Sequence, residues 1–137
     1  MLEKQVELIS HASVLISIGG LKILTDPWFV GTAFNEGWSL DPSPNFDTIK
    51  DKLADVDIVW ISHEHPDHLH FPTLKLIREF LPQRVRIAFQ ETNSDKVFDA
   101  LRKLGYNDFI RLEHMKKLEL NEIVSIAVCL LLKAMAL

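Results

Sequence analysis

A run of metal-binding side chains follows an apolar segment near the middle of the chain. Residues 63–68 read His-Glu-His-Pro-Asp-His, directly after Asp-Ile-Val-Trp-Ile-Ser at residues 57–62. Imidazole nitrogens and carboxylate oxygens are the ligands that zinc and related metals prefer. Open α/β sheets place their ligands beyond the carboxyl ends of strands. The motif therefore predicts a metal site at one edge of a sheet.

The spacing within the motif divides its ligands into two pairs. His63 and His65 are two residues apart in extended chain, so their side chains point the same way and can bind one ion. Asp67 and His68 are adjacent, so they diverge from that pair and suit a second, nearby ion. Two ions about 3.5–4 Å apart polarise a substrate oxygen and generate hydroxide at neutral pH. The spacing thus favours hydrolysis.

Composition and charge restrict the class of protein. The chain has 137 residues, 47% hydrophobic and 25% charged, which is typical of one globular domain. The net charge of −4 offers no basic surface, so nucleic acid is not an expected partner. Cys129 is the only cysteine and the N-terminus carries no apolar signal segment. These features predict a cytoplasmic protein without disulfides.

The apolar segment at residues 123–137 has two interpretations. It is shorter than the roughly 20 residues that a membrane-spanning helix needs, so no membrane span is expected. It is either a buried strand running into a terminal helix, or the end of a chain that has lost its downstream sequence.

Strands are expected first, followed by alternating strands and helices. Gly19-Gly20 indicates a hairpin turn, and residues 28–45 form a long aromatic loop that we expect to be ordered. The predicted strands are 6–10, 12–18, 21–25, 56–62, 84–89, 109–112, 117–120 and 122–130. The predicted helices are 47–53, 72–80 and 94–104. This order predicts an α/β fold with layers of sheet and helix.

The motif at residues 63–68 resembles the signature of the metallo-β-lactamase superfamily. Ser-His-Ala-Ser at residues 10–13 and Thr-Asp-Pro-Trp-Phe at residues 25–29 are similar to its lactonase-like branch, which includes the L-ascorbate-6-phosphate lactonases. The resemblance covers roughly residues 5–125. It implies that the chain is the N-terminal half of an αββα sandwich.

Three further segments resemble the metallo-β-lactamase-type domain of the CMP-N-acetylneuraminate hydroxylase family. They are Gly-Thr-Ala-Phe-Asn-Glu-Gly-Trp at residues 31–38, the motif region 61–69, and Phe-Pro-Thr-Leu-Lys at residues 71–75. That hydroxylase activity needs a Rieske cluster, whose two cysteine ligands cannot come from one cysteine. The resemblance therefore implies the domain and not the hydroxylase chemistry.

The resemblance also implies roles for individual side chains. His63 and His65 would hold a first metal and Asp67 and His68 a second, with zinc expected and iron or manganese as alternatives. Asp67 is also the candidate catalytic residue. Asp26 would orient a ligating imidazole, although an aspartate before proline also forms turns.

Other residues are candidates for the surroundings of the metals. His11 ends the first strand and either faces the site or is structural. Trp28, Phe34 and Trp38 would shape a pocket for a small-molecule substrate. By resemblance, that substrate is a sugar acid, a sugar phosphate or a nucleotide sugar.

The sequence departs from the family pattern after the motif. Family members add a third histidine, a bridging aspartate and a last histidine, but only His70 and His114 follow His68. We expect His70 on the surface and His114 not to be a ligand. Residues 1–137 are thus predicted to be one incomplete domain, with weak or single-metal binding and little or no hydrolysis alone. Its uncovered sheet face would be buried by the apolar tail or by a second copy in a homodimer.

Three functions are compatible with these residues. The first is a metal-dependent hydrolase acting on an ester, lactone or phosphoester. The second is a non-catalytic remnant or binding module that keeps a nucleotide-sugar groove. The third is a subunit that a partner completes.

Overall fold

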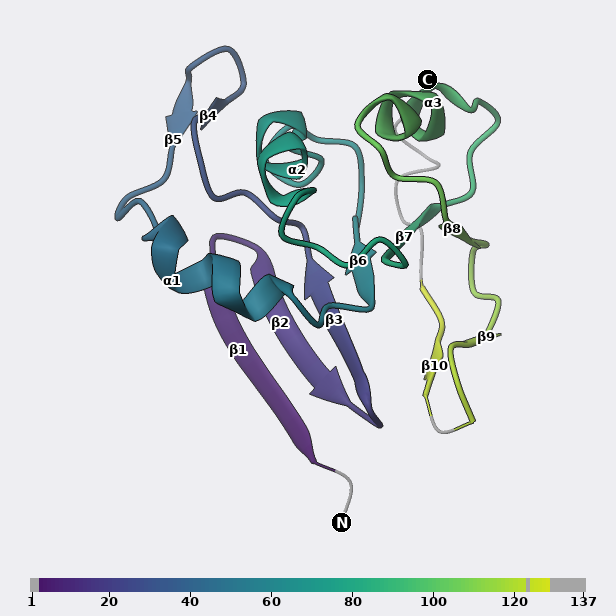
Figure 1. The fold of residues 1–137 in the computed structure, drawn as a ribbon. Helices are drawn as coiled ribbons and strands as arrows, with labels where there is room; N and C mark the ends of the chain where they lie inside the picture. Colours follow the sequence, from purple (N-terminus) through teal and green to yellow (C-terminus); the bar gives the residue numbers. More distant parts are fainter. Residues whose placement is uncertain (1–2, 123, 129–137) are drawn as a thin grey trace.

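The computed structural model describes residues 3–122 and 124–128 and is built on one mixed sheet of six strands (Figure 1). Its strand order is β1-β2-β3-β6-β7-β8. The antiparallel half comprises β1 (Lys4–Ser10), β2 (Ser13–Ile18) and β3 (Leu21–Thr25). The parallel half continues from β3 through β6 (Ile58–Trp60), β7 (Arg86–Gln90) and β8 (Phe109–Leu112). Because β3 and β6 are parallel neighbours, their carboxyl ends meet at the same edge of the sheet.

The predicted hairpin turn joins β2 to β3. Gly19 and Gly20 have φ values of 56° and 78°, a left-handed conformation that glycine adopts at little cost. The turn sets the register in which Ile16 faces Ile23 and Leu15 faces Leu24. Alternating side chains of these strands consequently face opposite sides of the sheet.

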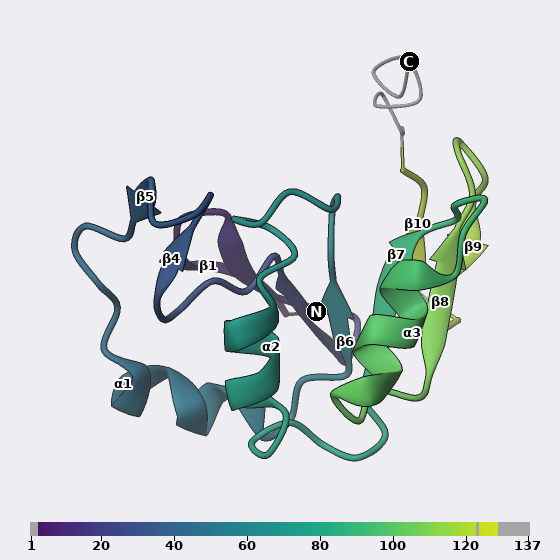
Figure 2. The same cartoon turned by 90° about the horizontal axis from the view of Figure 1, so that it is seen from above.

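Helices cover one face of the sheet (Figure 2). The helix α1 (Phe46–Lys50) is capped by Asn45, whose Oδ1 accepts from the Asp47 N–H, and continues into the short 3₁₀ turn η1 (Asp51–Leu53). The helices α2 (Phe71–Ile77) and α3 (Lys96–Lys103) follow β6 and β7. The main core lies between these helices and the sheet, with contributions from Leu24, Val59, Ile87, Leu74 and Phe98.

The opposite face of the sheet is covered only in part. A small hairpin of β9 (Leu118–Glu119) and β10 (Ser125–Ile126) accompanies a second cluster of buried side chains, Ile23, Ile58, Ala88, Ile110, Leu112 and Val128. At β1, however, Val6 and Leu8 are 72% and 71% exposed. Val6 is in register with Ile16 and Ile23, so it lies on this same face. Within residues 3–122 and 124–128, apolar side chains on this face of β1 are thus exposed.

Four predictions of local structure need correction or lie outside the described residues. The long loop at residues 28–45 contains a short hairpin of β4 (Thr32–Ala33) and β5 (Trp38–Ser39). The predicted strand at 56–62 is regular over only three residues. Among the described residues of the predicted strand at 122–130, only Ser125–Ile126 forms a regular strand, and the predicted terminal helix lies outside the described residues. Among the helices that are described, none combines the length and the apolar character needed to cross a membrane.

Tyr106 connects the segment after α3 to α2 through a side-chain hydrogen bond. It is 1% exposed, and its hydroxyl donates a 2.7 Å hydrogen bond to the Leu74 carbonyl. Burial raises the pKa of Tyr106, so the phenol keeps the proton that it donates. We expect Tyr106→Phe to lower the free energy of unfolding by about 1–1.5 kcal/mol, because it removes one buried hydrogen bond and little volume. Urea denaturation measures this, and an unchanged midpoint would contradict it.

Candidate metal centre

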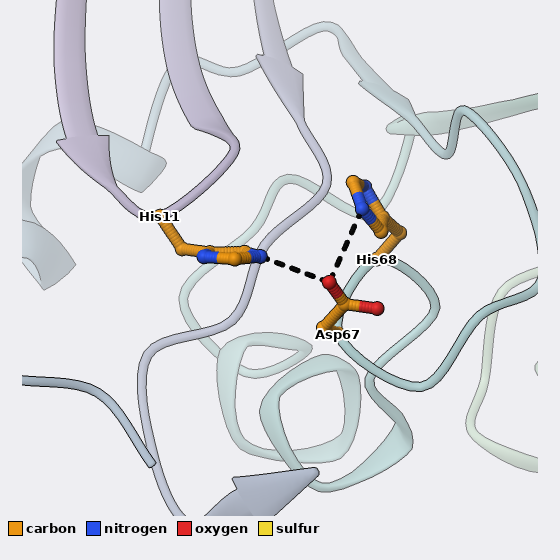
Figure 3. A group of neighbouring side chains, drawn as sticks. All are labelled: His11, Asp67 and His68. Atoms are coloured by element: carbon orange, nitrogen blue, oxygen red, sulfur yellow. Dashed lines mark hydrogen bonds and ion pairs between the residues drawn. The ribbon is translucent and has the colours of Figure 1, made fainter. Parts of the chain in front are cut away.

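Three loops bring titratable side chains together at the carboxyl edge of the sheet. His11 lies in the turn between β1 and β2, Asp26 follows β3, and the motif residues follow β6. Figure 3 shows His11, Asp67 and His68 pointing toward one another. His11 Nε2 is 2.9 Å from Asp67 Oδ2, and His68 Nε2 is 3.3 Å from the same oxygen. One ligand atom from each residue lies within 4.8 Å of the other two, as a shared metal ion requires.

Asp26 is at the centre of a hydrogen-bond network that includes Ser62 and His68. It is 5% exposed and follows β3, with a φ of 36° in the left-handed region. Its Oδ1 accepts from the Ser62 backbone N–H at 2.7 Å. Its Oδ2 accepts from the Ser62 hydroxyl at 2.7 Å and is 2.8 Å from His68 Nδ1. Asp26 therefore lies against the Nδ1 side of the His68 ring.

The network fixes which ring nitrogen carries a proton. A carboxylate only accepts, so His68 donates its Nδ1–H to Asp26. The Ser62 hydroxyl gives its one proton to Asp26 and therefore accepts from His63 Nδ1, which is 2.9 Å away. In the neutral form, both imidazoles then carry a lone pair on Nε2. These are the atoms through which the two rings can bind a metal.

The electrostatics of Asp67 suit a cation. Burial is the largest single influence and raises the pKa of Asp67, but the His11 hydrogen bond, the charge of His68, a backbone hydrogen bond and the charge of His11 together hold that pKa below its usual range. The carboxylate is 5% exposed, and its Oδ1 has no hydrogen-bond partner among the described residues. A buried, charged oxygen without a partner is costly unless a cation or water satisfies it.

His63 and His65 extend the cluster on its other side. The His63 ring lies 4.1 Å from that of His68 and 4.5 Å from that of His65, measured between centroids. Burial, and then the charges of His68 and His65, lower the pKa of His63. A lowered pKa keeps the imidazole neutral, which metal binding requires. His63 thus lies beside both His65 and His68, whereas the group whose ligand atoms all lie within 4.8 Å of one another is His11, Asp67 and His68.

The donor set fits a divalent metal of the borderline class. It consists of imidazole nitrogens and carboxylate oxygens, with Asp67 Oδ1 left without a partner. His114 follows β8 and forms an isolated bridge with Val128, and it is not a member of the group of close ligand atoms found among the described residues. In the described part of the chain, the candidate ligands therefore come from His11 and residues 63–68.

The three aromatic residues assigned to a pocket occupy different environments. Phe34 and Trp38 are 39% and 53% exposed, and their rings are 5.0 Å apart. Phe34 lies 6.4 Å from the His65 ring, and Trp38 lies 6.5 Å from the His11 ring. Trp28 is buried instead, with its ring 5.1 Å from that of His11. Phe34 and Trp38 can contact a ligand directly, whereas Trp28 supports His11 from behind.

His70 is a correction to the sequence prediction. It was expected on the surface but is 3% exposed, because it caps α2 and its ring packs 5.7 Å from Trp28. Burial lowers the pKa of His70.

Ser62 is the residue of the network that sequence reasoning missed. Its position directly before His63 was the available signal, because a hydroxyl there can reach both Asp26 and the first imidazole.

Comparison with known proteins agrees with this geometry. Residues 5–120 match the family model described as the beta-lactamase superfamily domain, and the chain belongs to that family. The resemblance and the layered α/β fold class predicted from the sequence are thereby confirmed.

Curated relatives are similar over the N-terminal part of the chain. Cytidine monophosphate-N-acetylneuraminic acid hydroxylase of Asterias rubens is 44% identical over 80 residues, which cover 58% of this chain and 12% of the relative. The Xenopus laevis protein of that name is 40% identical over 80 residues, covering 58% and 13%. A Homo sapiens relative named as inactive is 40% identical over 73 residues, covering 53% and 14%. The matched segment is thus a small part of each relative.

Solved structures share the fold at low identity. CmlA, a diiron beta-hydroxylase from Streptomyces venezuelae, has a TM-score of 0.58 at 22% identity and covers 85% of this chain and 22% of its own. An isothiocyanate hydrolase from Delia radicum gut bacteria has a TM-score of 0.55 at 21% identity, covering 83% and 42%. This chain therefore corresponds to part of a larger metallo-β-lactamase-type fold.

Proposed function

We propose that this chain is the metal-binding part of a metal-dependent hydrolase, in which His63, His65, Asp67 and His68 hold one or two divalent cations. Zinc suits the nitrogen and carboxylate donors, and iron or manganese are the alternatives. A bound cation would supply Lewis acidity and would acidify a water molecule toward neutral pH. Asp26 and Ser62 orient the imidazoles, and His11 orients Asp67.

One observation carries this proposal. His68 Nδ1 donates to Asp26, so in the neutral ring the Nε2 lone pair faces Asp67 Oδ2 at 3.3 Å. Two acceptors at that separation repel each other unless a proton or a cation lies between them. The unpartnered Asp67 Oδ1 adds a second acceptor that a cation would satisfy. Imidazole and carboxylate are thus held in the arrangement in which a divalent cation relieves both.

The aromatic hairpin and the curated relatives support a substrate class. Phe34 and Trp38 border the imidazoles and offer exposed ring faces, which bind the flat faces of sugars and bases. The relatives are named for a cytidine monophosphate sugar acid. We propose a sugar acid, sugar phosphate or nucleotide sugar as the substrate, with an ester, lactone or phosphoester bond hydrolysed.

A binding module, or a subunit that a partner completes, is the second candidate function. It is favoured because His63 and His65 for one ion, and Asp67 and His68 for a second, would give only two ligands per ion, whereas a catalytic zinc has three protein ligands and a water. The isolated chain is expected to turn over slowly if it is a hydrolase, and not at all if it is a binding module or a subunit without its partner.

Turnover assays test the hydrolase proposal. The purified chain, loaded with zinc, iron(II) or manganese(II), is incubated with bis(p-nitrophenyl) phosphate, a sugar lactone and CMP-N-acetylneuraminic acid. We expect slow hydrolysis of at least one of them, abolished by a chelator and by His65→Ala. Metal-independent binding of the CMP sugar without turnover would favour the binding module. Turnover that chelator and His65→Ala leave unchanged would overturn the proposal.

A further inference from the structure

His70 makes hydrogen bonds through both ring nitrogens to different parts of the fold. Nδ1 caps the start of α2 by accepting from the Thr73 N–H at 3.2 Å. It also lies 2.9 Å from the Thr73 hydroxyl. Nε2 lies 3.0 Å from the Thr32 carbonyl oxygen, at the start of β4. A carbonyl only accepts, so Nε2 carries the proton and Nδ1 is the acceptor. The ring therefore links α2 to the β4–β5 hairpin.

The segment before Thr32 contacts the His70 ring and the first turn of α2. Gly31, directly before Thr32, has a φ of 68°, and the nearest atom to a Cβ there would be His70 Cε1 at 3.8 Å. On the other side, the Thr73 Oγ1 accepts from the Phe29 N–H at 3.0 Å. Both ends of the segment that leads into the hairpin are thus tied to the first turn of α2.

The hairpin that His70 holds has a strained turn. Phe34, Asn35 and Glu36 are consecutive non-glycine residues with φ values of 55°, 51° and 66°. Side chains disfavour this left-handed conformation, and it persists only where surrounding contacts enforce it. One such contact is the 3.0 Å hydrogen bond from the Gly37 N–H to the Phe34 carbonyl. The turn places Phe34 beside His65, and Trp38 follows beside His11.

We propose that His70 is a positioning residue, which fixes the aromatic hairpin (residues 32–39) beside the candidate metal centre through its bond to Thr32. Its role differs from that of the neighbouring motif residues, because both of its ring nitrogens are engaged by Thr32 and Thr73. Phe34 and Trp38 depend on it for their place next to the imidazoles. The inference goes beyond the proposed function, since it concerns the hairpin and does not require a bound cation.

Two substitutions separate the two bonds of the ring. In His70→Asn, the amide oxygen can replace Nδ1 as the helix cap, but the side chain is too short to reach Thr32. In His70→Gln, the terminal amide nitrogen can replace Nε2 and donate to Thr32. Hydrogen exchange measured on peptides from residues 31–40 reports the hairpin, and elemental analysis reports metal content.

The two variants have opposite expected results. We expect His70→Asn to speed exchange in the hairpin by about fivefold, the effect of losing one hydrogen bond, while His70→Gln stays near wild type. Metal content should be the same in all three proteins. Equal exchange in His70→Asn and wild type, or equal acceleration in both variants, would overturn the proposal. Failure of all three proteins to bind metal, with the exchange pattern as expected, would remove the proposed function and leave this inference standing.

Discussion

Replacing Asp26 by asparagine is expected to lower the affinity for a divalent cation by about 10–100-fold, the usual effect of losing the partner that orients a ligating histidine. Asp26 accepts from the Ser62 N–H, the Ser62 hydroxyl and His68 Nδ1. An asparagine has one acceptor oxygen, and its amide group would face a donor. His68 would lose the bond that fixes its tautomer, and His63 would lose its indirect support through Ser62.

Titration calorimetry with zinc and with iron(II) measures this effect. The matched control is Asp99→Asn, which makes the same chemical change in an exposed ion pair with Arg102. The control should bind metal as the wild type does. Equal affinities of Asp26→Asn and the control would show that the network does not orient the ligands.

The largest effect on stability is expected from Phe98→Ala. Phe98 is fully buried in α3, with its ring 5.8 Å from that of Phe89 and 5.2 Å from that of Phe109. The Arg111 guanidinium carbon lies 4.0 Å from the centre of the Phe98 ring. Truncation leaves a cavity and removes these contacts, so we expect a loss of about 3–5 kcal/mol. Since domains are stable by only about 5–15 kcal/mol, much of the folding free energy would be lost.

Urea denaturation followed by circular dichroism measures the loss. Phe34→Ala is the matched control, because Phe34 is 39% exposed at the hairpin turn and its truncation should change stability by about 0.5 kcal/mol or less. If both variants unfold at the same urea concentration, the helical layer over β7 and β8 does not form the core described above.

The sequence determined the regular elements well where strong turn signals bounded them. The predicted strands at 21–25 and 109–112 have the observed bounds of β3 and β8. Gly19-Gly20 and Asp26-Pro27 bound the first of these on both sides, so its ends could be read locally. The histidines and the aspartate of residues 63–68 could also be predicted to lie close together, because they are nearly contiguous and follow a strand.

Contacts between distant segments could not be read from local patterns. The bond of His70 spans 38 residues to Thr32, and that of His11 spans 56 residues to Asp67. Nothing near His70 in sequence indicates that its ring is covered, because Trp28 and Thr32 cover it from the aromatic loop. The β4–β5 hairpin was missed because its turn uses left-handed Phe34, Asn35 and Glu36, where only Asn commonly signals such a turn.

Elemental analysis of the purified chain tests most directly whether residues 63–68 form a metal centre. The same measurement is made on His63→Ala and His68→Ala. We predict about one equivalent of zinc, iron or manganese in the wild type, as expected for a site with nitrogen and carboxylate donors, and clearly less in both variants. No metal above background in the wild type, or metal that both variants retain in full, would contradict the account.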